Sequence, residues 1–87
     1  MAYFALINED NVVVNVIVAE LQDFTGKPVT VAEQDTVATT VLNRFGEGRW
    51  LATSYNSEFR GKYAGIGDTY DAEADVFVQP EEDEDDN

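Results

Sequence analysis

Two apolar runs open the chain, and a short polar stretch separates them. Residues 3–7 are apolar throughout, and residues 12–18 are β-branched at every position except Asn15. Between them, residues 8–11 (Asn-Glu-Asp-Asn) favour a turn, because asparagine tolerates left-handed backbone. The pattern predicts a β-hairpin. Both faces of residues 12–19 are largely apolar, so we expect this strand at the centre of the sheet or covered on both sides.

The middle of the chain carries a helical pattern instead. Residues 20–29 contain a glycine and a proline and predict an irregular connector. Beyond them, apolar side chains recur every three or four residues, at Ala38, Val41, Leu42 and Phe45. Thr30 and Glu33 have the spacing of a capping box, and Gly46 stands where a C-terminal glycine belongs. These signals predict one helix over residues 31–45.

The last third of the folded region returns to strand patterns. Residues 49–55 read as a third strand, and residues 56–68 are rich in glycine and polar side chains and predict a loop. Residues 69–79 predict a second hairpin, which Pro80 ends. The order β-β-α-β-β-β predicts a single α+β domain over residues 1–80. We expect a small antiparallel sheet, made of two hairpins plus a strand, packed with one helix.

Charge separates the C-terminal stretch from this domain. Residues 81–87 hold six of the 18 acids of the 87-residue chain and no apolar side chain, which predicts a disordered acidic tail. The net charge is −13, and residues 1–80, with 12 acids and five bases, still carry −7. A protein that binds nucleic acid directly needs a basic surface, so neither DNA nor RNA is expected as a partner. No apolar run is long enough to span a membrane, and no membrane partner is expected.

The residue types exclude most catalytic chemistry. The chain has no cysteine and no histidine, which removes disulfides, thiol nucleophiles, Cys/His zinc sites and imidazole bases. Ser54 and Ser57 therefore have no histidine to activate them, and the Gly65-Ile66-Gly67 stretch is too short for a phosphate-binding loop. We expect no catalytic residues, no cofactor and no metal, and the protein is not expected to be an enzyme.

One group of acids nevertheless has a spacing that resembles a calcium loop. Asp71, Glu73, Asp75 and Glu82 match positions 1, 3, 5 and 12 of such a loop, but Val76 stands at position 6, where glycine is needed. A structural turn of the second hairpin accounts for the same residues with fewer exceptions. The pattern favours the turn and leaves cation binding by Asp71, Glu73 and Asp75 open.

The loop after the third strand holds the one cluster of aromatic and basic residues. Because tyrosine and arginine are favoured at protein interfaces, the cluster predicts a partner-binding surface, made of Tyr55, Phe59, Arg60, Lys62, Tyr63 and Ile66. An equally weighted alternative is that Phe59 and Tyr63 cover the core while the two bases neutralise neighbouring acids.

Several stretches resemble a family of short proteins of unassigned activity encoded by tailed bacteriophages of marine bacteria and cyanobacteria. They are Met1-Ala2-Tyr3-Phe4-Ala5-x-Ile7, Val16-Ile17-Val18, Trp50-x-x-Thr53-Ser54-Tyr55-Asn56, Phe59-Arg60-x-x-Tyr63-Ala64-Gly65-Ile66-Gly67 and Thr69-Tyr70-Asp71-x-x-x-Asp75-x-Phe77-Val78-x-Pro80. The likeness covers most of residues 1–80. Family members often continue past Pro80 with a segment containing proline and tryptophan, where this chain has acids. The resemblance implies a phage origin and a place in the virion.

These observations together predict a virion accessory protein, foremost a capsid decoration or cement protein on the outer capsid surface, assembled in the host cytoplasm. Its expected partner is the major capsid protein or another virion protein, bound through the loop 55–66 and an exposed strand edge at Tyr3–Ile7. Pairing of hairpin edges between copies, into a dimer or trimer, stays open. The alternatives are a tail, fibre or baseplate attachment module and, in another class, an acidic host-directed inhibitor.

Overall fold

The computed structural model of the protein describes residues 2–80, and the acidic tail predicted for residues 81–87 lies outside them. The elements follow in the order β1 (Ala2–Ile7), β2 (Val13–Ala19), α1 (Leu21–Thr25), the 3₁₀ turn η1 (Val31–Glu33), α2 (Gln34–Val41), the 3₁₀ turn η2 (Asn43–Phe45), β3 (Arg49–Thr53), β4 (Thr69–Asp71) and β5 (Val76–Val78). The predicted α+β class, both hairpins and the third strand are confirmed.

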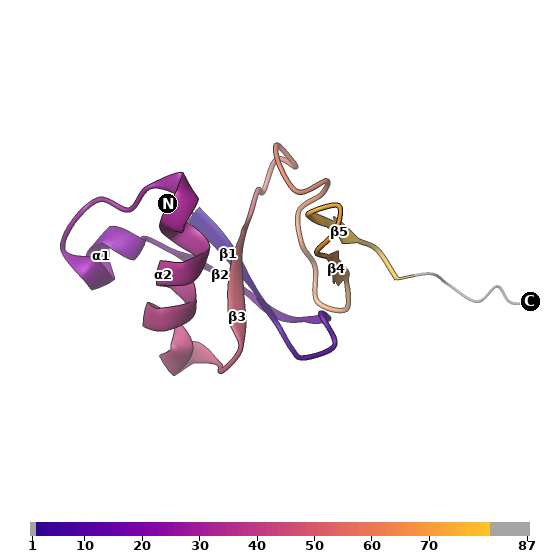
Figure 1. The fold of residues 1–87 in the computed structure, drawn as a ribbon, viewed down its shortest axis with the longest axis horizontal. Coiled ribbons are helices and arrows are strands. Elements are labelled where there is room, and N and C mark those ends of the chain that lie inside the picture. Colours follow the sequence, from indigo (N-terminus) through magenta and orange to yellow (C-terminus); the bar gives the residue numbers. More distant parts are fainter. Residues whose placement is uncertain (1, 81–87) are drawn as a thin grey trace, which may run out of the picture.

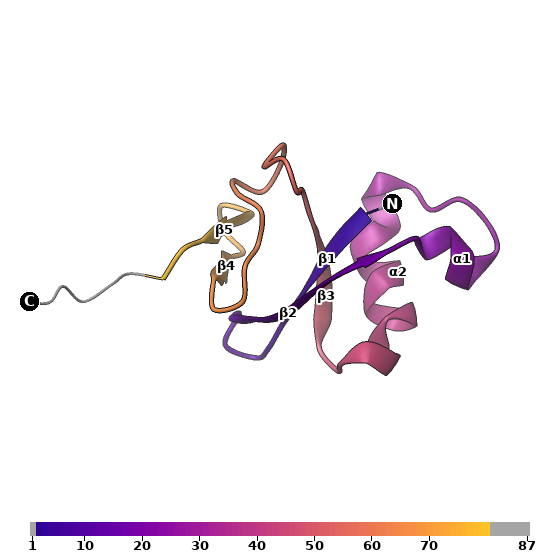
Figure 2. The same cartoon turned by 180° about the vertical axis from the view of Figure 1, so that it is seen from behind.

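These elements form three layers. A three-stranded antiparallel sheet in the order β2-β1-β3 stands in the middle, with α1 and α2 on one side and the β4-β5 hairpin on the other (Figure 1). The view from behind shows the same separation (Figure 2). The second hairpin forms a two-stranded sheet of its own, so the single sheet predicted from the sequence is in fact two. No helix within residues 2–80 is long and apolar enough to cross a membrane.

The central strand is β1, and the prediction of a central second strand and an exposed Tyr3–Ile7 edge was wrong. Residues 4–7 of β1 are all buried, because β3 returns beside β1 and both faces of the sheet are covered. β2 lies at the edge and leaves Val14 and Val18 exposed. An apolar run on both faces therefore did not distinguish a central strand from an edge strand whose side chains are partly exposed.

The first turn follows the expected chemistry. Asn11 has a φ of 63°, the left-handed conformation that asparagine tolerates. The side-chain oxygen of Asn8 accepts hydrogen bonds from the N–H groups of Asp10 and Val12, at 2.8 and 3.0 Å. The ladder also shifts register between Leu6 and Ile7, which inserts a β-bulge after the turn.

Alternation along β1 divides the core into two clusters. The side chains of Phe4 and Leu6 face the helices and pack with Trp50 and Leu42. Those of Ala5 and Ile7 face the second hairpin and pack with Phe77. The two core clusters therefore share one strand as their common wall, and β1 holds both outer layers in place.

The predicted helix over residues 31–45 is broken into a 3₁₀ turn, the eight-residue α2 and a second 3₁₀ turn. The capping box does not form, since the Thr30 side chain makes no capping hydrogen bond. β-Branched residues within the stretch lower its helix propensity, and 3₁₀ turns are frequent at helix ends. The prediction also missed α1, which begins inside the expected connector.

Gly46 follows the last 3₁₀ turn but does not act as a left-handed helix cap, because its φ is 154°. A side chain there would come within 2.6 Å of the Leu6 side chain. Its carbonyl accepts a hydrogen bond from the indole N–H of Trp50 at 3.0 Å. The glycine is needed for close approach to the core, not for ending a helix.

Candidate functional site

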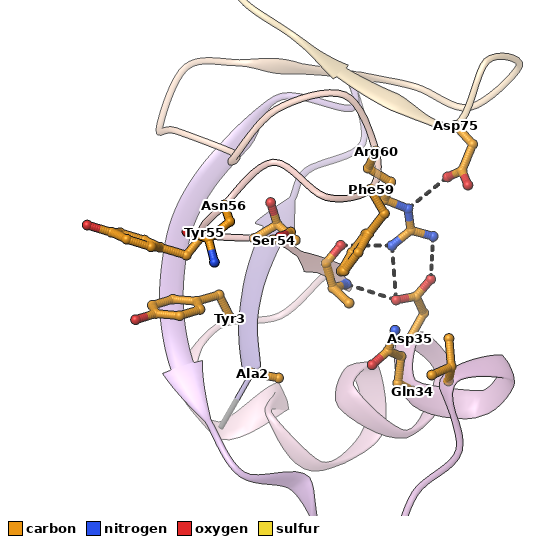
Figure 3. A pocket seen from close by; sticks show the side chains of 13 residues that line it. Ala2, Tyr3, Gln34, Asp35, Ser54, Tyr55, Asn56, Phe59, Arg60 and Asp75 are labelled. Carbon is orange, nitrogen blue, oxygen red and sulfur yellow. Dashed lines mark hydrogen bonds and ion pairs between the residues drawn. The ribbon is translucent and has the colours of Figure 1, made fainter.

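A cleft of about 600 Å³ opens at the end of the sheet where β1 begins and β3 ends. Figure 3 shows Tyr3 and Tyr55 on one flank and Phe59, Arg60 and Asp35 on the other. β1 supplies Tyr3 and α2 supplies Asp35, while the other three side chains come from the loop after β3. The cleft therefore depends on segments that are distant in the sequence.

Three tyrosines form the aromatic flank. The rings of Tyr3 and Tyr55 stack with centroids 5.6 Å apart, and Tyr63 stands edge-on to both, at 5.6 and 5.3 Å. Burial raises the pKa of Tyr63 above its ordinary value, and the neighbouring phenols of Tyr3 and Tyr55 add to the shift. Tyr55 remains 64% exposed. The cluster is thus a preformed aromatic surface with one ring turned to solvent.

Arg60 closes the opposite flank as the centre of an ion-pair network. Its guanidinium donates to both carboxylate oxygens of Asp35, at 3.2 and 2.6 Å, and to Asp75 at 2.8 Å. It also donates to the carbonyl of Ala52 in β3 at 2.9 Å. Burial lowers the pKa of Arg60, but the hydrogen bonds to Asp35 and Asp75 outweigh it and raise the pKa above its ordinary value. Arg60 therefore ties α2, β3 and the second hairpin together.

The second hairpin contributes Asp75 to this network. The Tyr70 hydroxyl donates to the Asp75 carboxylate at 2.5 Å, and this bond, with that from Arg60, lowers the pKa of Asp75. Burial and the same hydrogen bond raise the pKa of Tyr70. Arg60 and Asp75 have φ values of 57° and 56°. Each left-handed non-glycine residue costs on the order of 1 kcal/mol, which the network must offset.

Lys62 turns inward as well. Its ammonium group pairs with the buried carboxylate of Asp68, which also accepts the N–H of Gly65 at 2.8 Å. This pair holds the turn that presents Ile66, whose side chain is 72% exposed. Lys62 and Ile66 therefore belong to a neighbouring turn and do not line the cleft.

The structure thus divides the six side chains predicted to bind a partner. It brings Tyr55, Phe59 and Arg60 to the cleft and sets the ring of Tyr63 edge-on against that of Tyr55. The alternative, in which the two bases neutralise neighbouring acids, describes both Arg60 and Lys62. Tyr55, Phe59 and Ile66 remain the exposed members.

Ten of the 13 residues that line the cleft are absent from the six side chains predicted to bind a partner, among them Gln34, Asp35 and Asp75. Tyr3 and Asn56 lie in the two segments predicted as the partner surface, residues 3–7 and 55–66, but their side chains were not singled out. Tyr3 reaches the cleft because β1 pairs with β3, which sets Tyr3 opposite Thr53, two residues before Tyr55. The available signal for Tyr3 was a tyrosine at the start of the apolar run of residues 3–7. That signal names no partner until the strand pairing is known.

The serine hydroxyls at the cleft serve the loop. Ser54 accepts the N–H of Glu58 at 3.0 Å, and Ser57 accepts the N–H of Tyr63 at 3.2 Å. Both hydroxyls thereby fix the course of residues 54–63. The arrangement orders a surface and sets up no proton transfer to either oxygen.

The acids of the second hairpin also have structural partners. The Asp71 carboxylate accepts the N–H groups of Glu73 and Ala74, at 3.0 and 3.2 Å, while Asp75 belongs to the Arg60 network. Over residues 2–80 no group of three or more histidine, cysteine, aspartate or glutamate side chains is placed to hold a metal ion. Glu82, the remaining ligand of the calcium-loop hypothesis, lies outside the described residues.

A comparison with protein-family models, curated proteins and solved structures gave no match.

Proposed function

We propose that the protein is a non-catalytic binding module that docks another virion protein through the cleft, as a decoration or cement protein on the outer capsid surface. The observation that carries the proposal is a preformed cleft whose charged groups are bonded within the chain, while Tyr55 and Phe59 stay exposed at its rim. Such a surface suits an apolar side chain of a partner, because aromatic anchors dominate interface energetics.

The Arg60 network supports docking through preorganisation. Asp35 and Asp75 are already paired with Arg60, so a partner does not have to supply charges to them. Ordering a loop on binding costs affinity, and a loop that is fixed beforehand avoids part of that cost. Binding therefore rests on burying the rings of Tyr55 and Phe59 and the neighbouring Val31, which is also exposed.

Charge indicates the character of the partner surface. With a net charge of −13, the protein is steered toward a basic surface and away from phosphate backbones. A capsid repeats one such surface many times, so modest affinity at each site is enough to stabilise the shell. The assignment to a virion rests on the resemblance to phage proteins and not on the cleft.

The test is quantitative mass spectrometry of purified particles of the phage that encodes the protein. We expect a copy number near that of the major capsid subunit or a simple fraction of it. A handful of copies per particle would favour a tail, fibre or baseplate module instead. Absence from the particles would reject the virion function and favour a host-directed inhibitor.

A second measurement tests the cleft itself. Particles grown with the Tyr55→Ala or Phe59→Ala variant should carry fewer copies, because each substitution removes an exposed anchor without touching the core. Phe45→Ala is the matched control, since Phe45 is similarly exposed but lies on η2, away from the cleft. Equal occupancy by all three variants would refute docking at the cleft.

A further inference from the structure

The two edges of the three-stranded sheet are finished differently. At the β3 edge, the N–H of Trp50 donates to Thr39 Oγ1 at 3.0 Å, and the N–H of Ala52 donates to the Asp35 carboxylate at 2.8 Å. Thr39 and Arg60 in turn donate to the carbonyls of Trp50 and Ala52. Side chains therefore satisfy the outward backbone groups of these two residues and block this edge to another strand.

The bonds at β3 also fix which groups of β2 point outward. Along an antiparallel strand, the N–H and C=O groups of successive residues point alternately to the neighbouring strand on one side and to that on the other. The backbone N–H and C=O of Trp50 point away from β1. Those of its β1 partner Leu6 therefore point toward β2, where Leu6 pairs with Asn15. Val16 and Val18 consequently present their backbone groups to the outside.

Only the first part of this outer edge is occupied. Val13 exchanges hydrogen bonds with Gly67 and Asp68, at 2.8 and 2.7 Å, and the N–H of Val16 donates to the Asn15 side chain at 2.9 Å. Within residues 2–80, no hydrogen bond reaches the outward carbonyl of Val16 or the N–H and carbonyl of Val18.

The open segment is also free of charge. β2 reads Val-Val-Asn-Val-Ile-Val-Ala and has no lysine, proline or acid, the residues that usually protect an edge strand from pairing. Val18 is 49% exposed on this strand. In a chain with a net charge of −13, an uncharged edge is where two copies approach with the least repulsion.

We propose that two copies of the chain pair through this edge, with Asn15–Ala19 of one copy antiparallel to the same residues of the other. The segment is bounded by the Val13 contacts at one end and by the start of α1 at Leu21 at the other. Its midpoint is Ile17, so a two-fold axis at Ile17 uses the whole open segment. Val16 of each copy then pairs with Val18 of its partner: the Val18 N–H donates to the free Val16 carbonyl, and the Val16 N–H exchanges the Asn15 side-chain oxygen for the Val18 carbonyl.

This pairing joins two three-stranded sheets into one of six strands. A two-fold axis between antiparallel edge strands is perpendicular to the sheet, so both helical layers lie on one face and both second hairpins on the other. Tyr3 pairs with Val18 across β1 and β2, so the aromatic flanks of both copies share a face as well. The inference does not rest on the proposed function, because no residue of β2 lines the cleft.

The first test is sedimentation equilibrium of the purified full-length chain. We expect twice the 9.7 kDa mass of one chain, with tighter association at higher salt, since salt screens the repulsion between acidic copies. Val18→Lys should return the protein to a monomer, because it places a charge on the open edge. Val78→Lys, at a similarly exposed valine on β5, should leave the dimer intact. A monomer at concentrations up to about 1 mM would overturn the proposal.

The second test checks the register by disulfide cross-linking, for which the chain offers a cysteine-free background. Ile17→Cys should cross-link two copies, since residues facing each other across the axis have Cα atoms about 4.5 Å apart. In the same dimer, the Cα atoms of the two Val18→Cys residues lie about 8 Å apart, which is too far for a disulfide. Cross-linking of Val18→Cys but not of Ile17→Cys would overturn the axis at Ile17.

Discussion

The β2 and β3 edges belong to one sheet and present the same kind of backbone groups, yet only one of them is closed. At β3, side chains of Asp35, Thr39 and Arg60 occupy the outward backbone groups of Trp50 and Ala52. At β2, the segment Asn15–Ala19 keeps outward groups without a protein partner within residues 2–80. The packing of side chains against a strand, and not only the sequence of the strand itself, therefore determines whether its outward backbone groups stay free.

Burial explains why the closed edge needs its side chains. Trp50 and Ala52 are almost fully buried, so an unbonded N–H there would lose its contact with water and gain nothing in return. Val16 and Val18 are partly exposed, and their outward groups can bond to water. The two edges should therefore respond very differently to substitution.

The largest effect is expected at Asp35. Asp35→Ala removes the acceptor for the Ala52 N–H and both hydrogen bonds to Arg60. Because the Asp35 side chain is 32% exposed, we expect a loss of about 2 kcal/mol in the free energy of unfolding, less than for a fully buried pair. Urea denaturation measures it. Asp35→Asn keeps an acceptor for Ala52 and should lose less; equal losses would show that the ion pair alone matters.

Thr39→Val should destabilise the same edge by less than Asp35→Ala. The substitution keeps the shape of the side chain but removes the oxygen that accepts the Trp50 N–H, so we expect a loss of about 1 kcal/mol in the free energy of unfolding. Thr40→Val is the matched control, since Thr40 is exposed and its hydroxyl bonds only to the preceding helical turn. Indistinguishable urea midpoints for the two variants would mean that the Thr39 hydroxyl does not close the edge.

The contrast between the edges also marks the limit of sequence-based prediction here. The strands and both hairpin turns could be predicted because their signals are local, as with the asparagines of residues 8–11. The closing of β3 could not, since Asp35 lies 17 residues from Ala52 and 25 from Arg60. Nothing in the local pattern around Asp35 distinguishes it from a solvent-exposed acid at the start of a helix.

The candidate site was predictable to the same extent. Tyr55 and Phe59 stand in one loop and form a visible cluster, whereas Tyr3 joins them only through the pairing of β1 with β3. The inward turn of Arg60 and Lys62 likewise depends on acids supplied by other segments. Local composition revealed the aromatic part of the cleft, and tertiary pairing decided which side chains remain exposed.

The network that closes the β3 edge should be weakened at low pH through Asp75 and at high pH through Tyr70. The pKa of Asp75 is lower in the folded protein than its ordinary 3.8, so its stabilising contribution is present above that pH and is lost as the pH falls through the folded value. The pKa of Tyr70 is raised above 10.0, so stability falls as the pH rises past that value. Urea midpoints across pH should show both losses.

Asp75→Asn is the variant that checks this assignment. It removes the titrating carboxylate but keeps an oxygen near Arg60 and Tyr70, so the acid-side loss of stability should become smaller than in the unmodified protein. If the urea midpoint of the variant falls at low pH as much as that of the unmodified protein, the loss of stability belongs to other carboxylates. The contribution is expected to be modest, because the Asp75 side chain is 59% exposed and solvent screens its charge.

The smallest effect is expected at the open edge. Val18→Lys should change the free energy of unfolding of the monomer by no more than about 0.5 kcal/mol, because the side chain is half exposed and lies outside both core clusters. Measured in dilute protein, where monomers dominate, this value isolates the folded chain from its association. A loss as large as that of Asp35→Ala would show that the β2 edge is part of the folding core. A negligible loss, together with loss of the dimer, would show that Val18 acts on association and not on folding.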